Sequence, residues 1–226
     1  MVYKDIHKGI FLRRPNRFIA EVEINGGIEI CHVKNTGRCA DLLQAGATVF
    51  VERSVNPRRS TKYDLVSVYK GERLINMDSQ APNRAFGEYL MAGGFMPGIT
   101  LIKPESRFGG SRLDFYAEAG ERKAFIEVKG VTLEDNGVAL FPDAPTQRGV
   151  KHLNELTRCA AGGYDAFAVF VIQMKPVDYF TPNNKTHPQF GAALAEAVHA
   201  GVSAMAFDCE VTADSMAIGS LVEIRL

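Results

Sequence analysis

Alternating apolar and polar residues predict β structure in the first third of the chain. Residues 18–24 (FIAEVEI) alternate strictly, and a second run at 28–33 follows Asn25-Gly26-Gly27, a triplet typical of tight hairpin turns. Further strands are predicted at 48–53, 63–69 and 73–77, and a short helix at 36–43. Five short strands with at most one small helix favour an OB-like small β-barrel, assigned to residues 1–83, a fold that commonly binds single-stranded nucleic acid.

The hydrophobic period changes after a boundary near residues 79–83. A nearly continuous apolar stretch at 166–174 (AFAVFVIQM) is typical of a strand buried on both faces of a mixed or parallel sheet. The other predicted elements are a helix at 84–92, strands at 99–104, 112–117 and 123–129, a turn at 135–137, a helix at 145–161 capped by Asp143, a helix at 187–200 and a strand at 202–208. This order predicts an α/β domain with a mixed central sheet over residues 84–226.

The composition bears on the core, on the state of the cysteines and on where the protein is located. Apolar residues make up 46% of the 226 positions, enough for buried cores. The four cysteines have no C-x-x-C spacing, so we expect reduced, partly buried thiols. The first residues have no apolar signal-peptide region, and no segment reaches the length of a membrane helix. We therefore expect a cytoplasmic protein with no membrane partner.

Charge is distributed unevenly along the chain although the total is zero. Residues 1–83 hold 13 Lys and Arg against 9 Asp and Glu, a net +4, and the remainder holds 13 against 17, a net −4. A basic phosphate-binding module joined to an acidic metal-binding module would give this asymmetry. Chance would give it as well.

The chemistry is concentrated on two neighbouring predicted strands. Asp114 lies between Leu113 and Phe115 on one strand, and Glu127 and Lys129 project from one face of the next. Two carboxylates supply the hard oxygen ligands that Mg²⁺ or Mn²⁺ prefers. A lysine beside them can orient water and stabilise charge in the transition state. We therefore assign catalysis to these three residues and metal binding to the two acids.

An aspartate followed at a distance by Glu-x-Lys is also the pattern of the PD-(D/E)XK phosphodiesterase superfamily. The pattern alone has low specificity, because a solvated strand face or a structural ion pair gives it too. The preceding helix offers Glu88 as a further metal ligand. The helix after the site presents Gln147, Arg148 and Lys151 for substrate phosphate, unless this is an ordinary solvated face.

Basic residues near the front of the chain form a candidate nucleic-acid surface. One group is Arg13, Arg14 and Arg17, and another is the loop at 56–62 with Arg58, Arg59 and Lys62. Such groups could grip a phosphate backbone, although most basic loops are only solvated. Residues 35–38 (NTGR) fit a phosphate-binding turn or the start of a helix. The histidines at 32, 152 and 187 are scattered and are interpreted as structural.

The chain resembles the SfsA family, the sugar fermentation stimulation protein homologues. The matching stretches are RRPNRFIAEVEI at 13–24, HVKNTGRCADLL at 32–43, GSRLDF at 110–115, IEVKGVTLEDNGVALFPDAPTQRGVKHLNEL at 126–156 and CEVT at 209–212. The resemblance implies an N-terminal OB-like domain, a C-terminal PD-(D/E)XK-like domain and DNA binding, with a regulatory role in sugar metabolism.

Two hypotheses about function follow. In the first, the chain is a DNA-binding protein with a divalent-metal-dependent nuclease site. In the second, it is a non-catalytic DNA-binding regulator of sugar-metabolism genes that retains a nuclease fold. A small-molecule enzyme has little support, because the sequence contains no phosphate-binding P-loop, dinucleotide fingerprint or nucleophile elbow.

Overall fold

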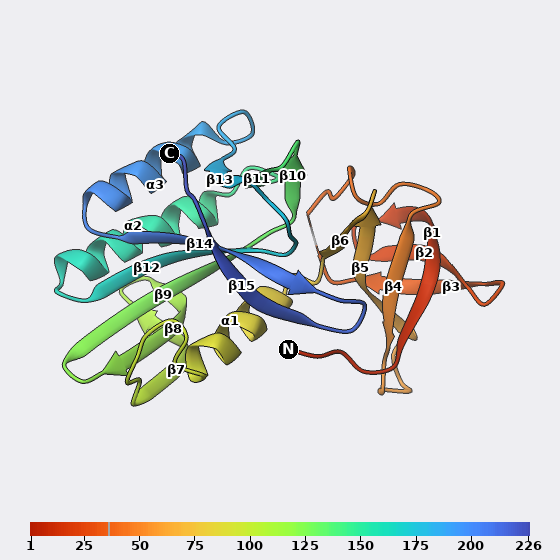
Figure 1. The fold of residues 1–226 in the computed structure, drawn as a ribbon, viewed down its shortest axis with the longest axis horizontal. Coiled ribbons are helices and arrows are strands. Elements are labelled where there is room, and N and C mark those ends of the chain that lie inside the picture. The colour runs from red at the N-terminus through yellow and green to blue at the C-terminus, as the bar shows by residue number, and fades with distance from the viewer. Residues whose placement is uncertain (36) are drawn as a thin grey trace.

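The structure is a computed structural model that describes residues 1–35 and 37–226, and it consists of two domains side by side (Figure 1). In the described part of the N-terminal domain, the regular elements are all strands. They are β1 (Ile6–Asn16), β2 (Ile19–Ile24), β3 (Gly27–Val33), β4 (Thr48–Arg53), β5 (Tyr63–Lys70) and β6 (Arg73–Asn76).

Five of these strands close into the predicted OB barrel. The sheet runs β3-β2-β1-β4-β5, and a short parallel pairing of β3 with β5, from Cys31↔Tyr63 to Val33↔Leu65, completes the ring. The sixth strand, β6, pairs only with β5 and continues toward the second domain. The barrel therefore contains β1, which the pattern analysis missed, in place of the strand predicted at 73–77.

β1 escaped prediction because its alternation is interrupted. Its register against β2 shifts between Phe11 and Arg13 and again before Asn16, so neighbouring side chains do not keep to one face. Gly9 allows the two strands to approach closely. A Cβ there would lie 2.5 Å from Val22 Cγ1.

Of two local features predicted for this domain, a hairpin is confirmed and a helix is wrong. The hairpin between β2 and β3 has positive φ at Asn25 and Gly26, as predicted. The helix expected at 36–43 is wrong for the described residues 37–43, which contain a turn at 40–42 and no helix, and residue 36 lies outside the described residues. Cys39 has a φ of 45°, a value no helix accepts, while Leu42 and Leu43 are buried under the barrel.

The C-terminal domain is α/β, as predicted. Its six-stranded mixed sheet has the order β15-β14-β12-β9-β8-β7, in which β9, β12 and β14 are parallel and the other neighbours are antiparallel. The elements are α1 (Ala81–Met91), β7 (Leu101–Phe108), β8 (Ser111–Ala119), β9 (Arg122–Val131), β10 (Leu133–Asp135), β11 (Val138–Phe141), α2 (Gln147–Ala161), β12 (Asp165–Ile172), β13 (Tyr179–Pro182), α3 (Pro188–His199), β14 (Ser203–Val211) and β15 (Met216–Val222).

Helices cover both faces of this sheet. α1 packs on one face through Phe86 and Leu90, in a cluster that also holds Ile126 and Val128 of β9. α2 and α3 pack together on the other face (Figure 1). The alternation of β9 therefore directs its odd-numbered residues, including Glu127 and Lys129, toward α2. α1 begins three residues before its predicted start because Pro82 fits the first helical turn, where no amide hydrogen is needed.

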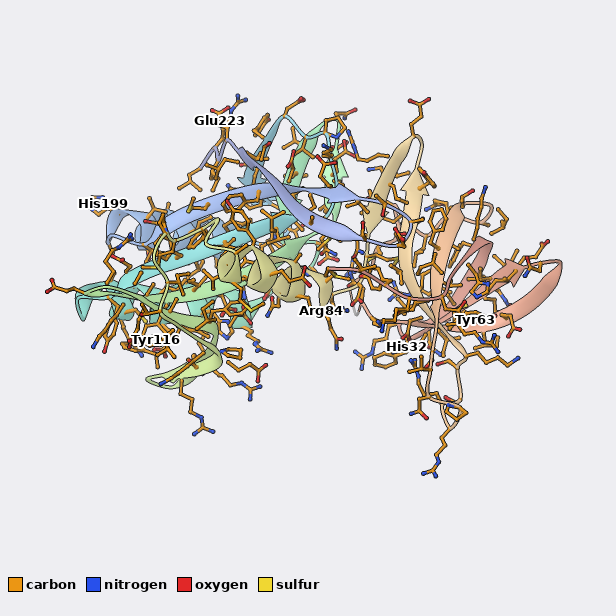
Figure 2. All side chains as sticks on the ribbon, turned by 60° about the horizontal axis from the view of Figure 1, so that its bottom comes forward. His32, Tyr63, Arg84, Tyr116, His199 and Glu223 are labelled. Carbon is orange, nitrogen blue, oxygen red and sulfur yellow. The ribbon has the colours of Figure 1, made fainter. Side chains whose placement is uncertain are left out.

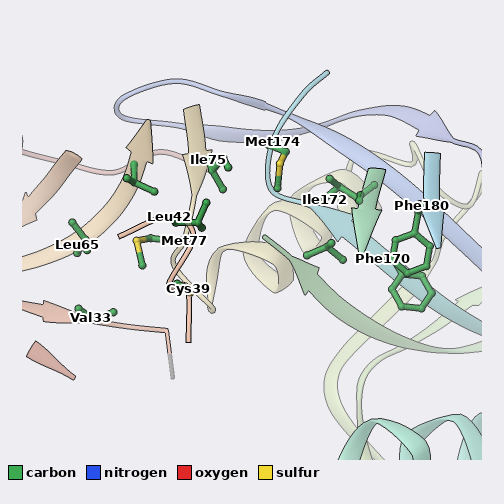
Figure 3. Close-up of a cluster of buried hydrophobic side chains, with 14 of the residues drawn as sticks. Val33, Cys39, Leu42, Leu65, Ile75, Met77, Phe170, Ile172, Met174 and Phe180 are labelled. Carbon is green, nitrogen blue, oxygen red and sulfur yellow. The ribbon is translucent and has the colours of Figure 1, made fainter. Parts of the chain in front are cut away.

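One hydrophobic cluster runs through the domain junction without interruption. In Figure 3 the barrel side chains of Leu65 and Met77 lead through Ile75 to Met174 and Ile172 of the C-terminal domain. All five are fully buried or nearly so. Because the same cluster fills both domains, their relative placement is determined by packed apolar surface.

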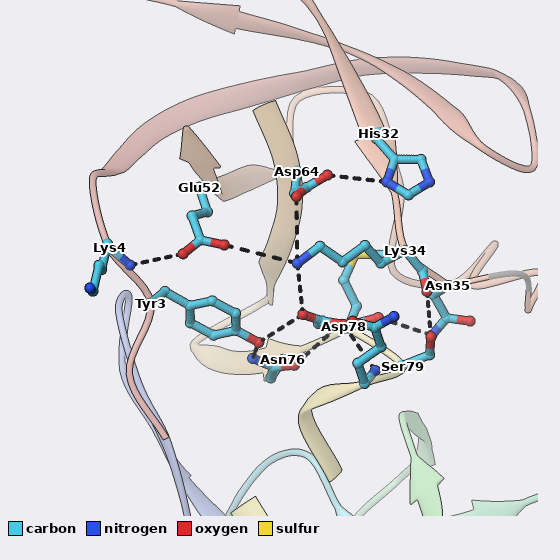
Figure 4. Close-up of polar contacts among 12 residues, drawn as sticks. Tyr3, Lys4, His32, Lys34, Asn35, Glu52, Asp64, Asn76, Asp78 and Ser79 are labelled. Atoms are coloured by element: carbon cyan, nitrogen blue, oxygen red, sulfur yellow. Dashed lines mark hydrogen bonds and ion pairs between the residues drawn. The ribbon is translucent and has the colours of Figure 1, made fainter. Parts of the chain in front are cut away.

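A network of polar groups also crosses the domain junction. Lys34 Nζ lies 3.1 Å from Asp78 Oδ2 and 3.5 Å from Asp64 Oδ2, and Tyr3 shares Asp78 (Figure 4). The network ties β3 and β5 to the segment that enters α1. Arg84 of α1, labelled in Figure 2, also lies at this junction, with its guanidinium carbon 6.0 Å from the centroid of the Tyr3 ring.

None of the helices in residues 1–35 and 37–226 is long and apolar enough to cross a membrane. All four cysteines are buried and free, as expected.

Candidate active site

The three predicted catalytic residues lie together where β8 and β9 separate. Within these fully described strands, the pairing ends at Phe115↔Ile126. Beyond that point the Asp114 side chain takes the place of a strand partner, since its Oδ2 accepts a hydrogen bond of 2.8 Å from the Val128 amide. Its Oδ1 accepts one of 2.7 Å from Asn83 Nδ2 of α1. Asp114 is thus fixed by both the sheet and a helix.

Glu127 and Lys129 project from the same face of β9 and touch. Lys129 Nζ donates to Glu127 Oε1 at 2.5 Å, and His152 of α2 contacts the same oxygen through Nδ1. His152 Nε2 accepts from Arg148 Nε at 3.4 Å, so the hydrogen-bond partners favour the tautomer with the proton on Nδ1. Glu127 is 4% exposed, and its second oxygen, Oε2, is buried without a partner among the described residues.

The two carboxylates are in opposite electrostatic situations. Burial raises the pKa of Asp114, and the charge of Glu127 raises it further, more than the Val128 amide, Lys129 and Asn83 lower it. Burial also pushes the pKa of Glu127 upward, but His152 and Lys129 outweigh burial and hold this pKa below its usual range. The ionised form of Glu127 is already favoured, so a cation near the two carboxylates would favour ionisation of Asp114 more than that of Glu127.

The donor set fits a hard divalent cation. The buried, unpartnered oxygen of Glu127 needs a positive partner, and Asp114 is an acid destabilised by a neighbouring acid. No group of three or more His, Cys, Asp and Glu side chains arranged to hold a metal exists in the described part of the chain. The protein thus offers two carboxylates, a supply typical of Mg²⁺ sites that complete their coordination with water and substrate phosphate.

Glu88 does not belong to this site, contrary to the prediction. Its carboxylate lies 2.6 Å from the Met1 amino group, and its side chain is 54% exposed. Asn83 is the α1 residue that faces Asp114, and a residue five positions later points about 140° away around a helix.

The start of α2 borders the site, although with a different cap from the one predicted. Thr146, rather than Asp143, caps the helix by accepting from the Gly149 amide at 3.0 Å. Gln147 and Arg148 are exposed on its first turn, as a substrate-facing role requires. Lys151 is exposed too, but its ammonium donates to the Gly110 carbonyl at 2.9 Å and so braces the loop between β7 and β8.

Several of the predicted nucleic-acid-binding residues bind groups of the protein itself. Arg59 makes a two-pronged ion pair with Asp64, and Arg13 makes one with Glu21. Arg14 donates to four backbone carbonyls, those of Arg17, Asn35, Gly37 and Arg38, which shapes the loop after β3. These contacts account for three of the six predicted basic residues of the barrel without any external phosphate.

The other three basic residues are more available. Arg17 lies over the ring of Phe18, with its guanidinium carbon 4.6 Å from the ring centroid. Lys62 lies 3.5 Å from Glu29 and remains 68% exposed, and Arg58 is exposed. Nucleic-acid binding by this surface stays a prediction.

Sequence reasoning missed Asn83 and His152. Asn83 stands at the expected domain boundary, where no pattern marks an amide as functional. His152 was interpreted as structural, yet it lies four residues after Arg148 on one helix face, and that spacing was the available signal.

This combination of an OB barrel with a nuclease-like α/β domain defines a two-domain class of protein. Residues 12–77 match the family described as SfsA N-terminal OB domain, and residues 80–215 match the one described as Sugar fermentation stimulation protein RE domain. The chain therefore belongs to the SfsA family.

Relatives and a solved structure agree with this assignment over the full length. Sugar fermentation stimulation protein homologs from Desulfitobacterium hafniense (strain Y51) and Ruminiclostridium cellulolyticum are 60% and 56% identical, covering 100% of this chain and 99% and 100% of theirs. The structure of Pyrococcus furiosus SfsA in complex with Ca²⁺ matches with a TM-score of 0.90 at 29% identity, covering 100% of this chain and 98% of that one.

Proposed function

We propose that the chain is a DNA-binding nuclease that hydrolyses phosphodiester bonds with a divalent metal ion. The observation that supports this most is that Asp114 on β8 lies close enough to Glu127 and Lys129 on β9 for their charges to shift its pKa, with Glu127 Oε2 buried and unpartnered among the described residues. The Ca²⁺ named for the Pyrococcus furiosus relative supports a divalent cation at this fold. Mg²⁺ or Mn²⁺ is the cation we expect in catalysis.

Each side chain has a definable task in this proposal. Asp114 and Glu127 would hold the cation, which when bound polarises a phosphate oxygen and lowers the pKa of its water. Asn83 and the Val128 amide orient Asp114, and His152 orients Glu127. Lys129 would place its ammonium against the developing negative charge of the phosphate.

The substrate would approach over the first turn of α2. Gln147 and Arg148 are exposed there, beside His152 and therefore beside Glu127. A guanidinium suits a phosphate oxygen, and the helix N-terminus contributes partial positive charge. The barrel residues Arg17, Arg58 and Lys62 would hold more distant phosphates.

Strand cleavage tests the proposal. The purified full chain is mixed with end-labelled single- and double-stranded DNA and RNA, in Mg²⁺, in Mn²⁺ and in chelator. Glu127→Gln and Lys129→Met are compared with two matched controls, Glu196→Gln on the exposed face of α3 and Lys123→Met at the far end of β9. Thermal melting of every variant verifies that it is folded.

We expect metal-dependent cleavage that falls about 100-fold or more in both site variants and remains in both controls. Binding without cleavage in any metal would overturn the nuclease and favour the alternative, a DNA-binding regulator of sugar-metabolism genes. Cleavage that survives in Glu127→Gln would assign it to a contaminating enzyme.

A further inference from the structure

A small cavity lies between the two domains, at the end of β9 that follows Glu127 and Lys129. Its volume is about 120 Å³, comparable to roughly four water molecules and to one flat heterocycle. Asn35 and Ser79 line it from the side of the barrel and the linker. Gly130 lines it from β9, one residue after Lys129, and two residues after Val128, whose amide donates to Asp114.

The polar groups of the cavity present mainly hydrogen-bond acceptors. Gln173, 1% exposed, uses its amide nitrogen for the Asn76 carbonyl, the Asn76 side chain and the Asp78 carbonyl. These bonds determine the orientation of the amide and leave its oxygen, Oε1, directed toward Gly130. The Asp143 carboxylate also lines the cavity and is a second acceptor.

Gly130 keeps the cavity open at this acceptor. A Cβ at this position would lie 2.5 Å from Gln173 Oε1 and 2.7 Å from Pro82 Cγ. Any other residue would thus close the approach to the buried oxygen. The φ of Gly130 is not in the left-handed region, so the backbone does not require glycine here. The role of Gly130 is therefore to leave the approach to Gln173 Oε1 open.

The barrel side of the cavity is held rigidly. Lys34 is anchored to Asp78, Asn35 Nδ2 donates to the Met77 carbonyl, and Ser79 Oγ bonds the Lys34 carbonyl. Figure 4 shows these contacts between the end of β3 and the linker. The wall therefore comes preformed, as specific recognition of a small group requires.

The lining selects against phosphate. None of the described lining residues is Lys or Arg, and Asp143 would repel an anion. Leu133, Leu140 and Phe141 add apolar surface, which suits the faces of an aromatic ring, and Thr132 adds a hydroxyl. A neutral, flat ligand with adjacent hydrogen-bond donors fits this combination.

We propose that this cavity binds an unpaired guanine base of the nucleic-acid strand whose phosphodiester lies at the metal site. Guanine carries two neighbouring donors, the ring N1–H and the exocyclic amino group, on the edge that a carboxylate and an amide oxygen can read together. Adenine and cytosine offer only the amino group, and uracil and thymine only a ring N–H. The proposal rests on the proposed nuclease function, for which it specifies the substrate.

A base can enter such a cavity only when it is unstacked and unpaired. The preferred substrate is accordingly single-stranded nucleic acid, or a base extruded from a duplex. Cleavage would then be enriched at a constant distance from guanine.

Titration by NMR in the presence of chelator tests the cavity apart from catalysis, because neither metal nor cleavage is involved. GMP, AMP, CMP and UMP are added separately to the ¹⁵N-labelled full chain, with inorganic phosphate as a further probe. The amide signals of Gly130 and Thr132, both lining residues, report binding. Asp143→Asn is compared with Glu121→Gln, an exposed acid at the β8–β9 turn far along the sheet.

We expect saturable shifts with GMP at about tenfold lower concentration than with the other nucleotides, and a loss of that preference in Asp143→Asn alone. Equal shifts with all four nucleotides, shifts with phosphate alone, or no shifts would each overturn the guanine site. A guanine site with no strand cleavage in Mg²⁺ or Mn²⁺ would instead overturn the nuclease.

Discussion

Replacing Glu134 with glutamine should weaken the junction between the domains by a predictable amount. The Glu134 carboxylate, on β10, lies 3.0 Å from Lys70 Nζ and 2.7 Å from Arg73 Nη1 of the barrel hairpin β5–β6. It also accepts from the Gly137 amide at 2.6 Å. Burial opposes its ionisation, but these three partners prevail and lower the pKa of Glu134 to about 2 from an ordinary 4.5.

A shift of that size corresponds to roughly 3 kcal/mol between the two protonation states. Solvent screens part of it, because the Lys70 side chain is 32% exposed and that of Arg73 is 22% exposed. We therefore expect Glu134→Gln to lower the free energy of unfolding by about 1–2 kcal/mol at pH 7.

The pH dependence has a definite sign. A carboxylate with a lowered pKa stabilises the folded chain fully above its unfolded pKa, and the contribution disappears as pH falls from about 4.5 toward 2. The contribution of Glu134 is the difference in the free energy of unfolding between wild type and Glu134→Gln. Urea unfolding at pH 7 and at several pH values down to 3 measures it. Equal stabilities at pH 7, or a difference that does not shrink by pH 3, would refute this reasoning.

Three further predictions concern the metal, the thiols and one loop. Calcium titration calorimetry should give at least tenfold weaker binding for Asp114→Asn and unchanged binding for Glu88→Gln; equal losses would restore Glu88 to the site. Burial raises the pKa of the Cys159 and Cys209 thiols to about 12, so a thiol reagent at pH 8 should modify the native chain far more slowly than the urea-unfolded one. Gly109→Ala should cost about 2 kcal/mol in urea unfolding, because φ is +53° and the new Cβ would meet Glu155 Oε2 at 2.8 Å, whereas Gly93→Ala, also at positive φ but in open space, should cost about 1.

The hydrophobic period of the sequence and its turn-forming residues made much of the fold predictable. The hairpin at Asn25-Gly26 and the buried strand β12 follow from residues a few positions apart, and both were correctly expected. β1 was missed because its bulges, not its composition, determine which side chains face the barrel. The order of strands in the closed ring depends on the distant pairing of β3 with β5, which no local pattern encodes.

Part of the candidate site was likewise predictable from the sequence, and part of it was not. Glu127 and Lys129 are two apart on one strand, so strand alternation alone placed them together. Asn83 and His152 reach the site from helices on opposite faces of the sheet, and only tertiary packing brings them there. Arg14 and Arg59 were assigned to nucleic acid because sequence shows their charge but not the carbonyls and the carboxylate that they bind.

The most direct test of the central proposal is single-turnover cleavage of an end-labelled single strand, with Mg²⁺ or Mn²⁺ added to metal-free protein. We expect product only after metal is added, and at least about 100-fold less product for Glu127→Gln under the same conditions. An uncut strand that is bound by wild type, with either metal, would contradict it.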